Sequence, residues 1–232
     1  MSCILRVKRQ KDADSAPYWQ EFEVFPQKPD TVASTLAGLA ARSPLTDVQG
    51  NAAAAVAFEK GCGEAKCGAC AMVVNGRPAL ACKSFMRDLG DIVTLEPLSK
   101  FPVVKDLIVD RTAMHEDLKK MRAFLRERSD GRAADAEALY QSARCILCGC
   151  CLEVCPNYKA GGDFVGAAAA VVVYRLMVQE GDDAHRREIE KAYREKYYAS
   201  CGESLSCRTV CPAGIPVDEI IAKANSLCLF GK

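Results

Sequence analysis

The sequence has little histidine, one tryptophan and almost no net charge. Its 232 residues carry 31 Lys and Arg against 30 Asp and Glu, a formal net charge of +1. This balance argues against a partner recognised through bulk positive charge, such as nucleic acid or an anionic membrane surface. No stretch approaches about 18 consecutive apolar residues, and no apolar signal core follows the polar residues 1–11. We therefore expect no membrane span and no cleaved export signal.

Cysteine, by contrast, is abundant: of the fourteen cysteines, twelve fall into three groups, and Cys3 and Cys228 stand alone near the ends. Small secreted domains use such densities for disulfides, but those domains are usually under about 100 residues and follow a signal peptide. In a reducing compartment the same cysteines are expected to be metal ligands. The two histidines, His115 and His185, are too few for mixed Cys/His zinc sites, and we expect both to be solvated in their charged surroundings.

The pattern of apolar residues divides the chain into two parts. In the first part, alternation and turn signals predict one helix at residues 31–41 and strands at residues 3–8, 18–24, 69–74, 78–82 and 92–95. Asn75-Gly76 predicts a tight hairpin turn between two of these strands. The first part is therefore expected to be rich in β structure.

Helical spacing replaces the strands in the second part. Charged stretches at residues 106–130 and 183–198 predict surface helices, and the apolar run at residues 166–178 predicts a buried helix too short to span a bilayer. We expect an α+β chain, with one domain over residues 1–105 and a helical domain over residues 106–232.

The first cysteine group has the spacing C-x4-C-x2-C-x11-C, which is the plant-type 2Fe-2S pattern. Its members are Cys62, Cys67, Cys70 and Cys82. Gly61, Gly63 and Gly68 allow the backbone to approach a cluster and to point N–H groups at its sulfurs. The alternative, a four-cysteine zinc site, usually takes two short knuckles, which this spacing does not provide. The group therefore predicts a 2Fe-2S cluster.

The second group spells C-x2-C-x2-C-x3-C-P, a bacterial ferredoxin run whose fourth cysteine ligates the neighbouring cluster. The third group repeats this run with Ser204 at a middle position and ends at Cys211. If the fourth cysteine of each run ligates the cluster of the other run, one site is made by Cys145, Cys148, Cys151 and Cys211 and is predicted to hold 4Fe-4S. A 3Fe-4S site is then predicted for Cys155, Cys201 and Cys207.

Ser204 occupies the vacant ligand position of that second site. A centre with three irons and fewer thiolates is expected to have a more positive reduction potential than its neighbour. The alternative is that Ser204 ligates a fourth iron through its oxygen. The remaining cysteines, Cys3, Cys150 and Cys228, are expected to be small buried apolar residues.

These motifs together resemble the iron–sulfur subunit of succinate dehydrogenase and fumarate reductase. The resemblance covers nearly the whole chain and is carried by residues 62–70, 76–82, 95–98, 101–107, 145–148 and 211–212. It implies an N-terminal β-grasp, plant-type 2Fe-2S ferredoxin domain followed by an all-α, bacterial-type dicluster ferredoxin domain.

The resemblance also implies partners and a role. A flavoprotein subunit with FAD would interconvert succinate and fumarate, and this chain would relay single electrons between that FAD and a quinone. A cytochrome b-type membrane anchor, with haem b as a further group, would hold the chain peripherally at the cytoplasmic face of the membrane. The chain itself would have no catalytic acid or base.

The quinone end is expected to differ from that of many family members. They place Trp shortly after the Cys-Pro of the second group and His after the first cysteine of the third. Here residues 156–160 contain no Trp, and Gly202 follows Cys201. The resemblance therefore implies menaquinone, with Pro156, Tyr158 and Lys159 as candidate quinone-proximal residues.

Two alternatives remain open at this point. One is a soluble relative that exchanges electrons with thiols or another small donor instead of quinone. The other, of a different class, is a zinc-stabilised interaction module. Iron and acid-labile sulfide would distinguish the zinc module, and a membrane-embedded partner would distinguish the soluble relative.

Overall fold

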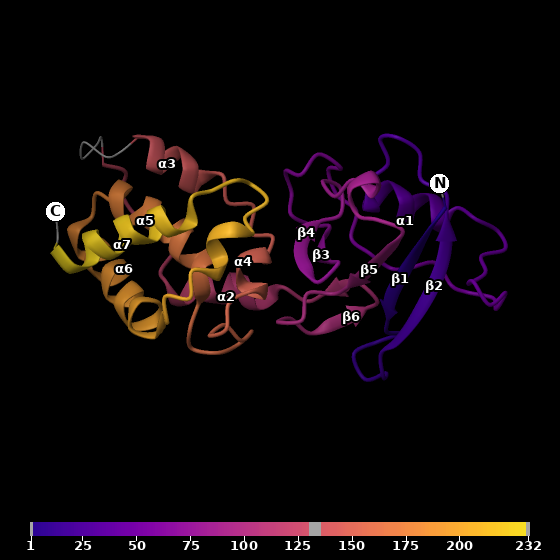
Figure 1. Ribbon diagram of the computed structural model, residues 1–232. Coiled ribbons are helices and arrows are strands. Elements are labelled where there is room, and N and C mark those ends of the chain that lie inside the picture. The colour runs from indigo at the N-terminus through magenta and orange to yellow at the C-terminus, as the bar shows by residue number, and fades with distance from the viewer. Residues whose placement is uncertain (1, 130–135, 231–232) are drawn as a thin grey trace. The chain divides into compact units, whose positions relative to one another are not determined.

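The computed structural model describes residues 2–129 and 136–230 and contains two compact units, Met1–Asp110 and Arg111–Lys232. No helix among the described residues is both long and apolar enough to cross a membrane. Figure 1 shows strands in the first unit and helices in the second. The first unit extends past residue 105 because the turn at Asp106 is hydrogen-bonded to Gln10 and Ala57 of that unit.

The first unit is a mixed sheet with strand order β2-β1-β5-β3-β4. The strands are β1 (Cys3–Arg9), β2 (Tyr18–Val24), β3 (Ala71–Val74), β4 (Arg77–Leu80) and β5 (Ile92–Glu96). β1 pairs antiparallel with β2 and parallel with β5, which gives the β-grasp arrangement. Alternate residues of β1 are buried, as the sequence pattern predicts.

Helix α1 (Val32–Ala40) fixes the segment that follows β4. Thr31 and Ser34 form a capping box at its start, which satisfies N–H groups that a helix end leaves unpaired. The amides of Val32 and Ala33 donate to the carbonyl oxygens of Ser84 and Ala81. Helix α1 is thereby tied to both sides of Cys82. The short 3-10 turn η1 (Met86–Asp88) follows.

A second, two-stranded sheet of β6 (Val103–Lys105) and β7 (Ile108–Val109) was not predicted. Its turn contains Asp106, whose φ is +46°. The strands have only three and two residues, which is too short for an alternating pattern to be recognised.

The second unit is helical, with α5 (Gly166–Gln179) at its centre. Helix α5 packs against α2 (Thr112–Lys120), α3 (Ala136–Ala143), α4 (Cys150–Glu153), α6 (Asp183–Lys196) and α7 (Val217–Phe230). Most of α5 is buried, so the prediction of a buried helix is confirmed. Two 3-10 turns, η2 (Tyr198–Ser200) and η3 (Ser206–Thr209), connect α6 to the last ligand segments.

The prediction of a helix over residues 106–130 was wrong for most of its length. Only Thr112–Lys120 is helical, and Arg122 has a left-handed backbone with φ of +54°. Residue 130 lies outside the described residues. Some charged side chains of this stretch contact other segments instead: Lys120 donates to the Gly162 carbonyl oxygen, and Arg126 pairs with Asp182.

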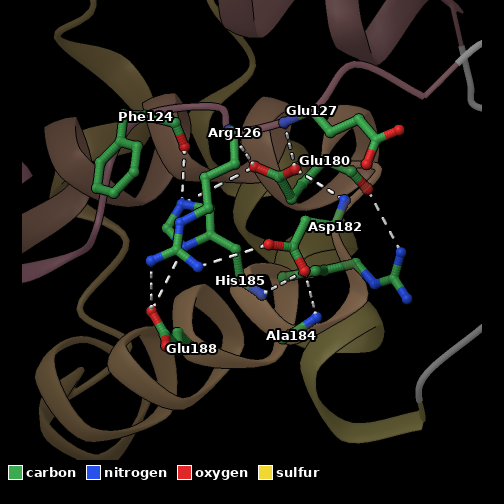
Figure 2. Close-up of polar contacts among 9 residues, drawn as sticks. Phe124, Arg126, Glu127, Glu180, Asp182, Ala184, His185 and Glu188 are labelled. Carbon is green, nitrogen blue, oxygen red and sulfur yellow. Dashed lines mark hydrogen bonds and ion pairs between the residues drawn. The ribbon is translucent and has the colours of Figure 1, made fainter.

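The expectation that His185 is solvated was also wrong, because its side chain is fully buried. Figure 2 shows it between the Phe124 carbonyl oxygen, 3.1 Å from Nε2, and the Glu188 carboxylate, 3.4 Å from Nδ1. His115 is exposed, as expected. Polar contacts to backbone and carboxylate satisfy the buried ring nitrogens, and these partners were not visible in the sequence.

Glu180 and Asp182 lie near His185, in the turn between α5 and α6 (Figure 2). The buried Glu180 carboxylate accepts hydrogen bonds from the backbone amides of Arg126, Glu127 and Asp182 at 2.8–3.0 Å. Burial opposes ionisation, but these three donors outweigh it and hold the pKa of Glu180 below its usual range. Asp182 caps α6 through the amide of Ala184.

Candidate metal centres

Three cysteines of the first group lie in one loop, and Cys82 joins them from beyond β4; backbone amides donate to all four sulfurs. The amides of Glu64 and Lys66 lie 3.3 and 3.2 Å from Cys62 Sγ. The further donor–acceptor pairs are Cys62 N to Cys67 Sγ, Ala65 N to Cys82 Sγ and Cys82 N to Cys70 Sγ, at 3.3–3.5 Å. Amides aimed at sulfur stabilise thiolates, the form that binds iron.

The local backbone makes this convergence possible. Gly63 and Gly68 have φ values of +72° and +75°, a region that favours glycine. A Cβ atom at Gly61 would lie 2.5 Å from Cys67 Sγ, so a side chain there would displace the sulfur. The loop therefore requires glycine for close approach at position 61 and for turning at the other two.

The thiols of this group do not have uniform environments. Hydrogen bonds from Glu64 and Lys66 lower the pKa of Cys62 to about 7, whereas burial raises the pKa of Cys70 to about 11. Cys62 and Cys67 are exposed and Cys70 is buried. One side of the group is thus exposed and the other is buried in the protein. Its set of thiols and amide donors fits an iron–sulfur cluster.

A buried ion pair holds the chain that leads into this loop. Arg9 donates to both carboxylate oxygens of Asp106 at 2.9 and 3.0 Å, and the two residues are 3% and 2% exposed. The amide of Ala57 also donates to Asp106, at 2.9 Å. Arg9 further donates to the carbonyl oxygens of Ala54 and Ala55. Sequence reasoning missed this pair, because its partners are distant in the chain.

In the second unit, one cavity is lined by the four cysteines predicted for the 4Fe-4S site: Cys145, Cys148, Cys151 and Cys211. The remaining lining is mostly apolar and includes residues from α5 and the start of α7. A hydrogen bond from the Cys150 thiol is the main cause that lowers the pKa of Cys148 to about 7. Cys150 is fully buried, as predicted, but it also contacts a candidate ligand.

A separate cavity of about 230 Å³ is lined by Cys155, Cys201 and Cys207, together with Ser204. Burial raises the pKa of Cys207 to about 11. The Ser204 hydroxyl accepts a hydrogen bond from Ser206 at 3.3 Å. The structure therefore distributes the seven cysteines over two cavities in the sets that the crossed-ligand pattern predicts. Their assignment as ligands remains a prediction.

Two further residues at this cavity were missed by the sequence analysis. Asn157 donates from its amide nitrogen to the Ser200 carbonyl oxygen at 2.8 Å, which joins the segment after Cys155 to the one before Cys201. The hydroxyl oxygen of Tyr197 lies 3.5 Å from Cys201 Sγ. Burial is the main cause that raises the pKa of Tyr197, so its hydroxyl keeps its proton. The sequence signal that could have indicated this contact is the position of Tyr197, four residues before Cys201 at the end of a helical stretch.

The three candidate quinone-proximal residues are placed differently from one another. Pro156 and Lys159 are exposed. Tyr158 is buried, and its hydroxyl donates to the Asp117 carboxylate of α2 at 3.1 Å. The side chain that lines the 230 Å³ cavity from this segment is that of Asn157.

The described residues contain no group of three or more Cys, His, Asp or Glu side chains that could hold a single metal ion. Cys3 and Cys228 are buried, as expected. In the described parts of the chain, the cysteines of the three groups gather at the three sites above.

Comparison with known proteins supplies independent evidence on the sites. A family model described as "2Fe-2S iron-sulfur cluster binding domain" matches residues 4–116. A second, described as "4Fe-4S dicluster domain", matches residues 141–215. Each model covers one group of sites: the first match contains the first cysteine group, and the second contains the seven candidate ligands of the two helical cavities.

Similar proteins extend over most of the chain. The succinate dehydrogenase iron-sulfur subunit of Bacillus subtilis is 35% identical over 231 residues, which cover 94% of this chain and 89% of that protein. The fumarate reductase iron-sulfur subunit of Wolinella succinogenes is 33% identical, with coverage of 71% and 74%. A chain of the Mycobacterium smegmatis Sdh1 complex in the apo form has the same fold, with a TM-score of 0.72 at 23% identity and coverage of 97% and 95%.

Proposed function

The chain belongs to the iron–sulfur subunit family of succinate dehydrogenases and fumarate reductases, and on this basis we propose that it relays single electrons between FAD and a quinone. The FAD would belong to a flavoprotein partner, on which the carboxylate chemistry takes place. The quinone would be held by a membrane anchor. The observation that carries this proposal is the gathering of the predicted ligands at three distinct sites within one chain.

The residues at each site fit the group that the proposal assigns to it. Iron–sulfur clusters accept and release one electron without proton chemistry by the protein. The protein supplies thiolates, amides that donate to sulfur, and an apolar surrounding, and these set the reduction potential. The four thiols of the first cysteine group accept hydrogen bonds from backbone amides, which fits the 2Fe-2S centre of the matching family model.

The two helical cavities are proposed to hold different clusters. Four cysteines line the first, which fits 4Fe-4S. Three cysteines and Ser204 line the second, which fits 3Fe-4S, because a hydroxyl replaces the fourth thiol. The proposed order is FAD, 2Fe-2S, 4Fe-4S, 3Fe-4S and quinone, with the three-iron site at a more positive potential than the four-iron site.

Menaquinone is the proposed quinone because of the residues around the last site. Gly202 stands where many relatives of the ubiquinone type carry His, and a Cβ atom there would lie 3.0 Å from the Asn157 amide nitrogen. Leu205, 53% exposed, and Tyr198 line the same cavity. We propose that a membrane anchor of the cytochrome b type covers these apolar side chains at the cytoplasmic face of the membrane.

The test is to purify the tagged chain from detergent-solubilised host membranes and to add succinate. We expect a flavoprotein and a haem-bearing membrane protein to co-purify, and succinate to bleach the visible absorption of the clusters. A menaquinol analogue should reduce the same clusters from the other end. Purification of a brown chain from the soluble fraction, without a membrane partner and unresponsive to the quinol, would contradict the quinone-linked function.

A further inference from the structure

We propose that Tyr197 raises the reduction potential of the third centre by donating a hydrogen bond from its hydroxyl to the sulfur of Cys201. This inference rests on the proposed function, in which Cys201 is a ligand of that centre. The hydroxyl oxygen lies 3.5 Å from Cys201 Sγ. In the unligated chain the thiol is the donor. A thiolate on iron has no proton, so the hydroxyl becomes the donor in that pair.

The fold holds both partners of this contact in place. The amide of Cys201 donates to the Tyr197 carbonyl oxygen at 3.0 Å, so the two residues are joined through the backbone as well. The Tyr197 ring is 2% exposed and stacks on Phe164, with ring centroids 5.5 Å apart. The ring of Tyr193 packs on it at 5.2 Å. These contacts fix the position of the ring and keep its hydroxyl beside Cys201.

Burial of the Tyr197 hydroxyl also favours its contact with the Cys201 sulfur. Buried polar groups in folded proteins are nearly always hydrogen-bonded. Among the described residues, Cys201 Sγ is the partner recorded for this hydroxyl. Tyr197 lines the same cavity as Cys155, Cys201 and Cys207, so its hydroxyl is a polar donor at the wall of this site.

The direction of the effect follows from charge. Reduction adds a negative charge to the centre, and a donor at a ligand sulfur stabilises the more negative state. The potential is thereby raised. The absent fourth thiolate at Ser204 acts in the same direction, so the two features together favour electron arrival at this centre.

Tyr193 provides a matched control. Like Tyr197, it is buried and belongs to the same aromatic cluster. Its hydroxyl donates to the Asn225 side-chain oxygen at 2.8 Å and not to a candidate ligand. Tyr193→Phe and Tyr197→Phe therefore remove the same atom from adjacent rings, but only the second removes a donor to sulfur.

The experiment is an EPR-monitored redox titration of the three-iron signal in the assembled complex carrying each variant. At the wild-type midpoint, Tyr197→Phe should lower the ratio of reduced to oxidised centre roughly fivefold, which is about 40 mV for one electron. Tyr193→Phe should leave the ratio unchanged. Equal midpoints for wild type and Tyr197→Phe, or equal shifts in both variants, would overturn the tuning role.

A measurement on the wild-type complex removes any dependence on how well the variants fold. ENDOR spectra of the oxidised centre in H₂O and D₂O should reveal an exchangeable proton coupled to the cluster, and its absence would also overturn the tuning role. A wild-type complex with no three-iron signal would instead refute the ligand assignment of the proposed function. The two failures are therefore distinguishable.

Discussion

Asp106→Asn removes the charge of a buried ion pair while keeping the shape of the side chain. Asp106 has φ of +46°, and Asn tolerates this left-handed backbone about as well as Asp. The substitution therefore adds no backbone strain. It leaves the guanidinium of Arg9, which is 3% exposed, without its carboxylate partner.

The magnitude follows from burial and geometry. Asp106 accepts two hydrogen bonds from Arg9 and one each from the amides of Gln10 and Ala57, at 2.9–3.1 Å. Removing one partner of a buried, hydrogen-bonded pair costs about 3–5 kcal/mol of the free energy of unfolding. With a urea m-value of about 2 kcal/mol/M, the midpoint should fall by roughly 1.5–2.5 M.

The assay is urea unfolding of the cluster-loaded protein, followed by the visible circular dichroism of the 2Fe-2S centre. Glu21→Gln is the control, because Glu21 pairs with Arg6 on the same hairpin while both side chains are 40% or more exposed. Such surface pairs contribute about 1 kcal/mol or less. An Asp106→Asn midpoint within the range of this control would refute the argument that the pair holds the segment before the first cysteine loop.

Three further predictions concern other parts of the chain. Ser204→Cys should supply the missing thiolate, replace the three-iron EPR signal by a second four-iron signal on reduction, and lower that site's potential; an unchanged spectrum would count against the vacancy at Ser204. Gly61→Ala should deplete the 2Fe-2S centre, since its Cβ would lie 2.5 Å from Cys67 Sγ, whereas Gly38→Ala, with open space at its Cβ, should retain the visible absorption; equal cluster content in both variants would argue against close packing at Gly61. The lowered pKa of Glu180 means that its ionised form stabilises the fold fully above pH about 4.5 and that this stability is lost as pH falls through the lowered pKa. Glu180→Gln should flatten the dependence of the unfolding midpoint on pH in that window, and a variant curve parallel to that of wild type would contradict the assignment.

Local signals in the sequence were sufficient to predict the hairpins of the first unit, which contains the first cysteine group. The pair Asn75-Gly76 adopts φ of +48° and +75°, which is the geometry that a two-residue hairpin requires. Alternation over β1 and β2 predicts an antiparallel pair, and the structure confirms it with Leu5 opposite Phe22. These features depend on neighbouring residues alone, so they could be predicted without knowledge of the fold.

The features that sequence reasoning missed are contacts over long separations. Asp106 contacts Arg9, which lies 97 residues earlier in the chain, and His185 contacts the carbonyl oxygen of Phe124, which lies 61 residues earlier. The charged surroundings of His185 indicated exposure, but the partners that bury it are distant in the chain. Similarly, cysteine spacing predicted which thiols gather, but not that Tyr197 contacts one of them. Tertiary packing, which spacing does not encode, decides these cases.

We propose that three cysteines, with Ser204 at the vacant fourth position, hold a three-iron centre at the end of a chain of clusters. Low-temperature EPR of the air-oxidised complex tests it most directly. We expect a three-iron signal in the oxidised state, with 2Fe-2S and 4Fe-4S signals appearing on reduction. Two four-iron signals with no oxidised three-iron signal would contradict this cluster assignment, as would zinc or disulfides at the cysteines of the two helical cavities.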